Sequence, residues 1–191
     1  MSDVKILKFL IVDDEEDIRE ILSLQLQKLR FTIAGVEYSA EIQFADNGRT
    51  GFAKIESEWF DVVLTDFSMP EMDGIEMLAA IRGAGIEIPV VFLSGFGERA
   101  RSAEALRLGT YAFLGKPWKS DHLRTVMQGA AKQGLAMRSF AAQVSENIEK
   151  MGSLPLQRKK QLRNVFRSIF VGRDGLHRSD VCEINSRKKS A

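Results

Sequence analysis

The chain has only one cysteine, Cys182, among its 191 residues, so no disulfide bond can form within it. A single cysteine is typical of a protein from a reducing compartment. No apolar run approaches the roughly 20 residues that a membrane-spanning helix needs. Residues 1–8 also lack the pattern of a signal peptide. These absences together predict a cytoplasmic protein that has no membrane partner.

Net charge is also small, at +1, but it is unevenly distributed along the chain. Residues 151–191 hold ten Lys and Arg against three Asp and Glu, a net charge of +7. Residues 1–150 hold 17 against 23, a net charge of −6. The length suits one domain of ordinary size with an extension. A basic C-terminal segment therefore follows an acidic body.

Five short apolar runs alternate with stretches of helical periodicity. The runs are continuous rather than alternating, which is typical of parallel strands buried on both faces. The expected strands are Lys8–Val12, Ile42–Ala45, Val62–Thr65, Val90–Leu93 and Tyr111–Leu114. This alternation predicts an α/β protein with a doubly wound, five-stranded parallel sheet. Reactive groups should gather at the carboxyl ends of its strands.

Acidic side chains and a lysine stand at three of those strand ends. Asp13 and Asp14 end the first run, Asp66 ends the third, and Lys116 comes just after the fifth. Carboxylates that are crowded together are costly unless a cation joins them. Mg²⁺ suits such a place, because it takes oxygen ligands and keeps several waters. A carboxylate can also act as a nucleophile toward phosphorus, and a lysine can offset oxygen charge in the transfer.

These residues, with the turn Phe67–Gly74 after Asp66, resemble the receiver domain of bacterial two-component response regulators. The resemblance covers about residues 5–128 and implies a flavodoxin-like strand order, 2-1-3-4-5. Each feature alone has a simpler interpretation, such as an acidic first helical turn favoured by the helix dipole or a solvated lysine. Their joint occurrence at the expected strand ends favours the receiver.

The resemblance implies a role for each residue of the site. Asp66 is the phosphoacceptor. Asp13 and Asp14 hold Mg²⁺, or Mn²⁺ as the alternative, together with Asp66 and the backbone carbonyl of Ser68, and Asp14 is the more direct ligand. Lys116 contacts the phosphoryl group and is aimed by a cis Lys116-Pro117 bond.

The resemblance also implies switch residues and tuning residues. Ser94 is the switch hydroxyl that binds the phosphoryl group, and Phe113 is the aromatic residue that rotates inward with it. Ser68 and Phe96 flank the path of the water that hydrolyses the phosphoryl group. Because Phe96 is bulky and apolar, we expect slow autodephosphorylation.

Two segments depart from the receiver pattern. The connection at Phe31–Ala40 is longer than usual, and it either extends the second strand or forms a hairpin-like excursion. After the receiver, residues 1–128, we expect a helical extension over 129–171 and a basic, disordered tail over 172–191. The extension contains a second amphipathic helix, whose apolar stripe is Leu156, Leu162, Val165, Phe166, Ile169 and Phe170.

The predicted function is a phosphorylation-dependent signalling switch, not a turnover enzyme. A histidine kinase or phosphotransfer protein donates the phosphoryl group, and output passes through an unidentified downstream protein or a homodimer formed by the C-terminal helices. Folding back of the basic segment on the acidic body is a further interpretation. The alternative is a transcriptional regulator whose basic segment binds DNA, although no helix-turn-helix pattern supports nucleic-acid binding. A phosphatase of the haloacid dehalogenase type is disfavoured, because Ser68 stands where its second Asp would be.

Overall fold

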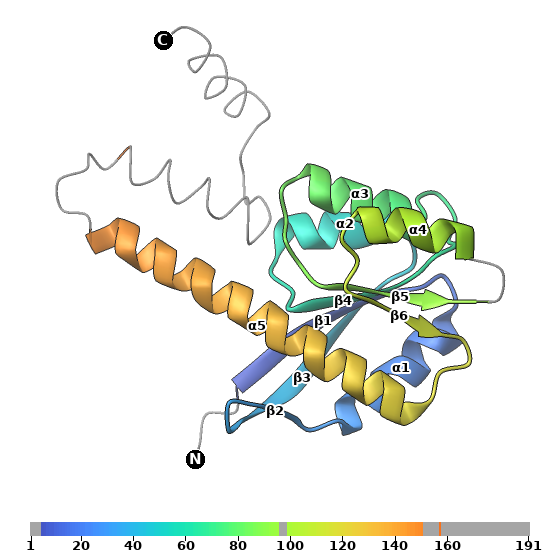
Figure 1. Cartoon of the computed structure of the whole chain (residues 1–191), viewed down its shortest axis with the longest axis horizontal. Coiled ribbons are helices and arrows are strands. Elements are labelled where there is room, and N and C mark those ends of the chain that lie inside the picture. The colour runs from blue at the N-terminus through green and yellow to red at the C-terminus, as the bar shows by residue number, and fades with distance from the viewer. Residues whose placement is uncertain (1–4, 96–98, 151–156, 158–191) are drawn as a thin grey trace, which may run out of the picture.

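The computed structural model describes residues 5–95, 99–150 and 157. Its strands are β1 Lys5–Val12, β2 Phe31–Ile33, β3 Val36–Ala45, β4 Val62–Asp66, β5 Val90–Ser94 and β6 Ala112–Gly115. Its helices are α1 Glu16–Lys28, α2 Gly48–Ser57, α3 Gly74–Gly83, α4 Arg99–Arg107 and α5 Ser120–Lys150. The strands form one sheet in the order β2-β3-β1-β4-β5-β6 (Figure 1).

The five predicted parallel strands are confirmed, and their order is that of the receiver resemblance. Beyond the five predicted parallel strands, β2 adds an antiparallel strand at the edge beside β3. Ala34 and Gly35 join the two strands with φ angles of 51° and 79°. Positive φ at both residues of a two-residue loop matches the twist of a hairpin. The long connection therefore meets both expectations, because it extends β3 and also forms a hairpin.

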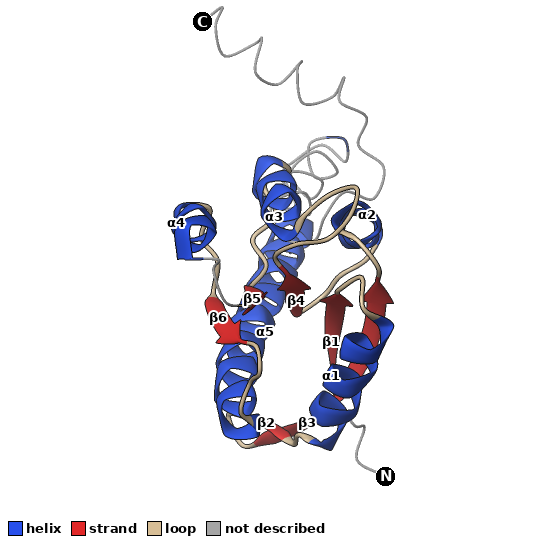
Figure 2. Ribbon diagram, turned by 90° about the vertical axis from the view of Figure 1, so that its right-hand side faces the viewer, coloured by secondary structure: helices blue, strands red, loops and turns tan. Residues whose placement is uncertain are grey.

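Helices cover both faces of the sheet (Figure 2). Leu10 and Val12 of β1 point toward the face covered by α2, α3 and α4. Phe9 and Ile11 point toward the opposite face, which α1 and α5 cover. Successive side chains of a strand alternate between faces, so a strand buried on both must be apolar at every position. Burial on both faces of the sheet therefore explains why the apolar runs in the sequence are continuous.

Helix α5 has 31 residues and runs without a break past residue 128, where the predicted receiver ends. At about 1.5 Å per residue it is about 46 Å long. The division of the chain at residue 128 stays a prediction. The predicted second amphipathic helix and the basic tail lie outside the described residues. Within the described part of the chain, no helix is both long enough and apolar enough to cross a membrane.

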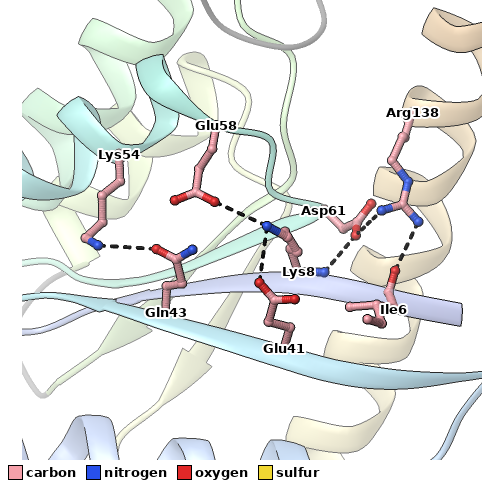
Figure 3. Close-up of polar contacts among 8 residues, drawn as sticks. All are labelled: Ile6, Lys8, Glu41, Gln43, Lys54, Glu58, Asp61 and Arg138. Carbon is pink, nitrogen blue, oxygen red and sulfur yellow. Dashed lines mark hydrogen bonds and ion pairs between the residues drawn. The ribbon is translucent and has the colours of Figure 1, made fainter. Parts of the chain in front are cut away.

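The middle of α5 is fixed to Asp61, the residue before β4 (Figure 3). Arg138 donates to the Asp61 carboxylate at 3.1 Å and to the carbonyl oxygen of Ile6 at 3.2 Å. The Asp61 side chain is fully buried, and it also accepts from the backbone N–H of Lys8 at 2.8 Å. Burial raises the pKa of Asp61, while the Lys8 N–H and the charge of Arg138 act in the opposite direction.

A glycine lets the helix come this close. A Cβ atom at Gly134 would overlap the carbonyl oxygen of Asp61 and lie 2.7 Å from its carbonyl carbon. Asp61 and Asp66 stand at opposite ends of β4, so about 17 Å of strand separates them at about 3.3 Å per residue. The α5 contact therefore lies at the end of the sheet opposite to the predicted site.

Candidate functional site

Three of the predicted site residues meet at the carboxyl ends of the parallel strands. Asp13 follows β1, Asp66 ends β4, and Lys116 follows β6. The Nζ atom of Lys116 lies 2.6 Å from Oδ1 of Asp66 and 3.2 Å from Oδ2 of Asp13. The Lys116-Pro117 bond is cis, as predicted. The backbone N–H of Lys116 also donates to the carbonyl oxygen of Ser94 at 2.7 Å, which fixes the loop to the end of β5.

In both Asp13 and Asp66, one carboxylate oxygen accepts a hydrogen bond from a backbone N–H and the other contacts the ammonium group of Lys116. For Asp13, the N–H of Glu15 donates to Oδ1 at 2.9 Å. For Asp66, the N–H of Ser68 donates to Oδ2 at 2.8 Å. The remaining oxygens of both acids face the same ammonium group. This arrangement turns the two carboxylates toward a common point.

The pKa values of Asp13 and Lys116 are both raised. Burial raises the pKa of Asp13, the Lys116 charge acts against this, and the Asp66 charge adds to it. Burial alone would lower the pKa of Lys116, but its hydrogen bond to Asp66 and the charges of Asp66 and Asp13 raise it. Lys116 therefore stays protonated, and its single positive charge faces two carboxylates. A further cation would be stabilised there.

The donor set fits a hard divalent cation. Among the described residues no three His, Cys, Asp or Glu side chains are grouped closely enough to hold a metal by themselves. Mg²⁺ needs only one or two protein carboxylates, since waters complete its octahedral shell. Asp13 and Asp66 supply two buried carboxylates, whereas Asp14 is exposed in the loop after β1.

The described switch and tuning residues, Ser94, Phe113 and Ser68, lie on the segments around this centre. Ser94 is half-buried at the end of β5, and its hydroxyl donates to the carbonyl oxygen of Gly95 at 3.5 Å. The half-buried Phe113 ring stacks on Phe67, with centroids 5.9 Å apart and planes 3° apart. Ser68 is exposed beside Asp66. Phe96 lies outside the described residues, so its predicted tuning role stays a prediction.

The loop from Asp66 to Gly74 contains contacts that the sequence reasoning missed. Asp73 caps α3, accepting from the N–H groups of Ile75 and Glu76 at 2.8 Å each. Glu76 completes a capping box, and this Asp-x-x-Glu spacing was a signal that could have found it. A Cβ atom at Gly74 would overlap the carbonyl oxygen of Asp66, so the loop requires glycine there.

Arg101 of α4 also contacts this loop. It donates to the Ser68 hydroxyl at 2.9 Å and forms an ion pair with Asp73. No sequence pattern marked Arg101, because an arginine in a helix is usually solvated.

Comparison with known proteins gives a consistent result. The family model described as the response regulator receiver domain matches residues 9–128. The regulatory protein AtoC of Escherichia coli (strain K12) is 37% identical over 123 residues, which are 64% of this chain and 25% of AtoC. The response regulator protein TodT of Pseudomonas putida (strain F1) is 27% identical over 160 residues, which are 84% of this chain and 66% of TodT.

Solved structures agree with the sequence relatives. The N-terminal domain of an uncharacterized protein (WS1339) from Wolinella succinogenes has a TM-score of 0.58 and 32% identity. The match covers 68% of this chain and 98% of that domain. FixJ-N has a TM-score of 0.56 and 26% identity, with 69% of this chain and 96% of FixJ-N covered. The similarity thus extends over the sheet and its helices, and this chain spans only part of the sequence relatives.

Proposed function

The chain belongs to the response regulator receiver domain family, and on this premise we propose that Asp66 is its phosphoacceptor. Receivers of this family work with histidine kinases or phosphotransfer proteins, and the chain is a phosphorylation-dependent signalling switch of this kind. The observation that carries the assignment to Asp66 is the position of Lys116, whose Nζ contacts Asp66 and Asp13 together. The backbone N–H of Ser68 also donates to Oδ2 of Asp66, while Lys116 contacts Oδ1.

The transfer forms one bond and breaks one. An oxygen of the Asp66 carboxylate attacks the phosphorus of a phosphohistidine, an O–P bond forms, and the P–N bond breaks. The imidazole nitrogen leaves with the electron pair of that bond. Lys116 offsets the charge of the phosphoryl oxygens, and the Ser68 N–H holds the second carboxylate oxygen of Asp66 in place. Positioning and charge compensation are the main tasks of the protein in such a reaction.

Mg²⁺, or Mn²⁺ in its place, would be held by Asp13, Asp14, Asp66 and the carbonyl of Ser68. When bound, the ion supplies charge compensation for the phosphoryl oxygens. Asp13 is suited to this role because it is fully buried and its pKa is raised by that burial, so that an added cation relieves an unfavourable charge. Asp14 joins from the exposed loop next to it.

The phosphorylated state is read by the residues around Asp66. The Ser94 hydroxyl binds the new phosphoryl oxygens, and Phe113 changes its position beside Phe67 and Phe92. Hydrolysis returns the switch to its resting state, and Ser68 and Phe96 set its slow rate. The chain catalyses its own phosphorylation and dephosphorylation and is not a turnover enzyme.

Output passes through protein contacts, either with a downstream protein or between two copies of the chain through the segment after residue 128. DNA binding by the basic segment is the second candidate, supported by its charge of +7 and by the name of one relative. That relative is the C4-dicarboxylate transport transcriptional regulatory protein DctD of Rhizobium meliloti, of which this chain covers 34%.

The phosphoacceptor can be identified by intact mass spectrometry after incubation with phosphoramidate and Mg²⁺. We expect the wild-type chain to gain one phosphoryl group and Asp66→Asn to gain none. Asp121→Asn is the matched control, since Asp121 lies exposed in the first turn of α5. It should react like the wild type. Phosphorylation of Asp66→Asn at the wild-type rate would refute the assignment.

A further inference from the structure

Arg101 connects α4 to the loop that carries the phosphoacceptor. Its guanidinium donates to the Ser68 hydroxyl at 2.9 Å and forms an ion pair with the Asp73 carboxylate. Its carbon Cζ also lies 5.8 Å from the centroid of the Phe67 ring, in a cation–π arrangement. All three partners belong to the segment between β4 and α3. A planar guanidinium can engage several acceptors at fixed angles, so these contacts fix the segment in orientation as well as in distance.

The same segment holds Asp66 in place. The backbone N–H of Ser68 donates to Oδ2 of Asp66, and the N–H of Gly74 donates to the carbonyl oxygen of Phe67 at 3.1 Å. Asp73 closes the segment by capping α3. Ser68 thus has two roles at once: its backbone supports the acceptor carboxylate, and its side chain is held by Arg101.

The two oxygens of Asp66 are therefore supported from different elements. Lys116, after β6, faces Oδ1, and the Ser68 N–H, within the loop after β4, faces Oδ2. The second support is connected to α4 through Arg101. Because a phosphoryl transfer depends on the alignment of the attacking oxygen, a displaced carboxylate reacts more slowly even when its chemistry is unchanged.

We propose that Arg101 is a positioning residue for phosphorylation: it acts through the Ser68 side chain to fix the Asp66 carboxylate, and so connects α4 to that carboxylate through the loop after β4. This proposal rests on the proposed function, in which Asp66 is the acceptor. The contacts of Arg101 described above are with Ser68, Asp73 and Phe67, so it acts on Asp66 through the loop. Its effect should therefore appear in the rate of the chemical step and not in the binding of the donor.

The test is a double-mutant cycle on the full chain. Arg101→Met removes the charge and the donors but keeps a long apolar side chain to pack on Phe67. Ser68→Ala removes the hydroxyl but keeps the N–H that supports Asp66. The rate constant of phosphorylation is measured by intact mass against the concentration of phosphoramidate, at fixed Mg²⁺. Thermal unfolding of each variant is recorded alongside.

We expect Arg101→Met to lower the saturating rate constant about tenfold, the effect of one charge-assisted hydrogen bond lost at the reacting step. The half-saturating phosphoramidate concentration should hardly change. Ser68→Ala should have a similar effect, and the double variant should be no slower than the slower single variant, because both changes break the same connection. Arg101→Lys, which keeps the charge but loses the planar fork, should lie between the wild type and Arg101→Met.

Arg107→Met is the matched control, since it removes an exposed arginine from the last turn of the same helix. Its rate should equal that of the wild type. Additive effects in the double variant, an unchanged rate in Arg101→Met, or a rise in the half-saturating concentration would each overturn the positioning role. If Arg101→Met fails to fold, the rate of Ser68→Ala decides, because an unchanged rate there overturns the proposal. A wild-type chain that is not phosphorylated at all would overturn the proposed function together with this inference.

Discussion

Gly134→Ala is the sharpest perturbation of the contact between α5 and the sheet. A Cβ atom there would overlap the Asp61 carbonyl oxygen and lie 3.1 Å from the Asp61 Cα. These atoms belong to the backbone of the segment leading into β4, so they cannot rotate away and the helix must retreat. Retreat also weakens the hydrogen bonds that Arg138 makes to Asp61 and to Ile6.

Three effects determine the magnitude. Alanine is favoured over glycine in a helix interior by about 1 kcal/mol. Overpacking against a rigid neighbour costs about 1–3 kcal/mol or more. Weakening the hydrogen bonds of a charged group costs about 1.5–3 kcal/mol. The balance predicts that Gly134→Ala lowers the free energy of unfolding by about 2–4 kcal/mol, against the direction of helix propensity.

The assay is urea unfolding followed by circular dichroism, with Gly129→Ala as the matched control in the same helix. At Gly129 the three atoms nearest to an added Cβ all belong to the exposed Tyr111 side chain, which can turn aside. We expect that control to differ from the wild type by less than about 1 kcal/mol. Equal or greater stability of Gly134→Ala would refute the close approach of α5 to Asp61.

Two further predictions concern the buried acids. Asp13→Asn removes a carboxylate whose pKa is raised by burial, so we expect a higher melting temperature without Mg²⁺ and loss of the further increase that Mg²⁺ gives the wild type. Thermal scans with and without MgCl₂ measure both, and equal stabilisation by Mg²⁺ in the two proteins would exclude Asp13 as a ligand. Burial likewise raises the pKa of Asp61, so at pH values between its unfolded and folded pKa the folded chain binds more protons than the unfolded chain. The stability of the wild type relative to Asp61→Asn should therefore fall as pH rises from about 4, the ordinary carboxyl range, through the folded pKa of Asp61. Urea midpoints at several pH values measure this difference, and an increase with pH would contradict it.

Much of the fold could be predicted from the sequence, because its strands are buried on both faces. Val62–Thr65 and Val90–Leu93 are buried at every position, and short, almost wholly apolar runs of this kind are typical of the central strands of a parallel sheet. The pair Asp13 and Lys116 could be predicted for a related reason, since parallel strands bring their carboxyl ends together. Local pattern and topology were sufficient for these features.

Other features depend on contacts between distant segments and leave no local signal. The sequence of Phe31–Ala40 was compatible both with a longer strand and with a hairpin. The hairpin at Ala34 and Gly35 depends on the pairing of β2 with β3 and on the packing of Phe31 against Phe9, with ring centroids 5.1 Å apart. Arg101 and Arg138 look like ordinary solvated helix residues until their partners are placed. In the sequence, Gly134 looks like a weak point of a helix, whereas in the fold it is the position that allows close approach.

Because the chain is synthesised from its N-terminus, the sheet face that α5 covers is made long before α5 itself. Strand β1 is the first described element to be synthesised, and one of its faces is covered in part by Leu123, Met127 and Ala130 of the last described helix. At about 5–20 residues per second, the roughly 40 residues from the end of β5 to Gly134 take about 2–8 s to make. During that time Phe9 and its apolar neighbours have no helix α5 to cover them. A chain truncated in this stretch would leave that apolar surface without its α5 cover, and we expect such a chain to aggregate.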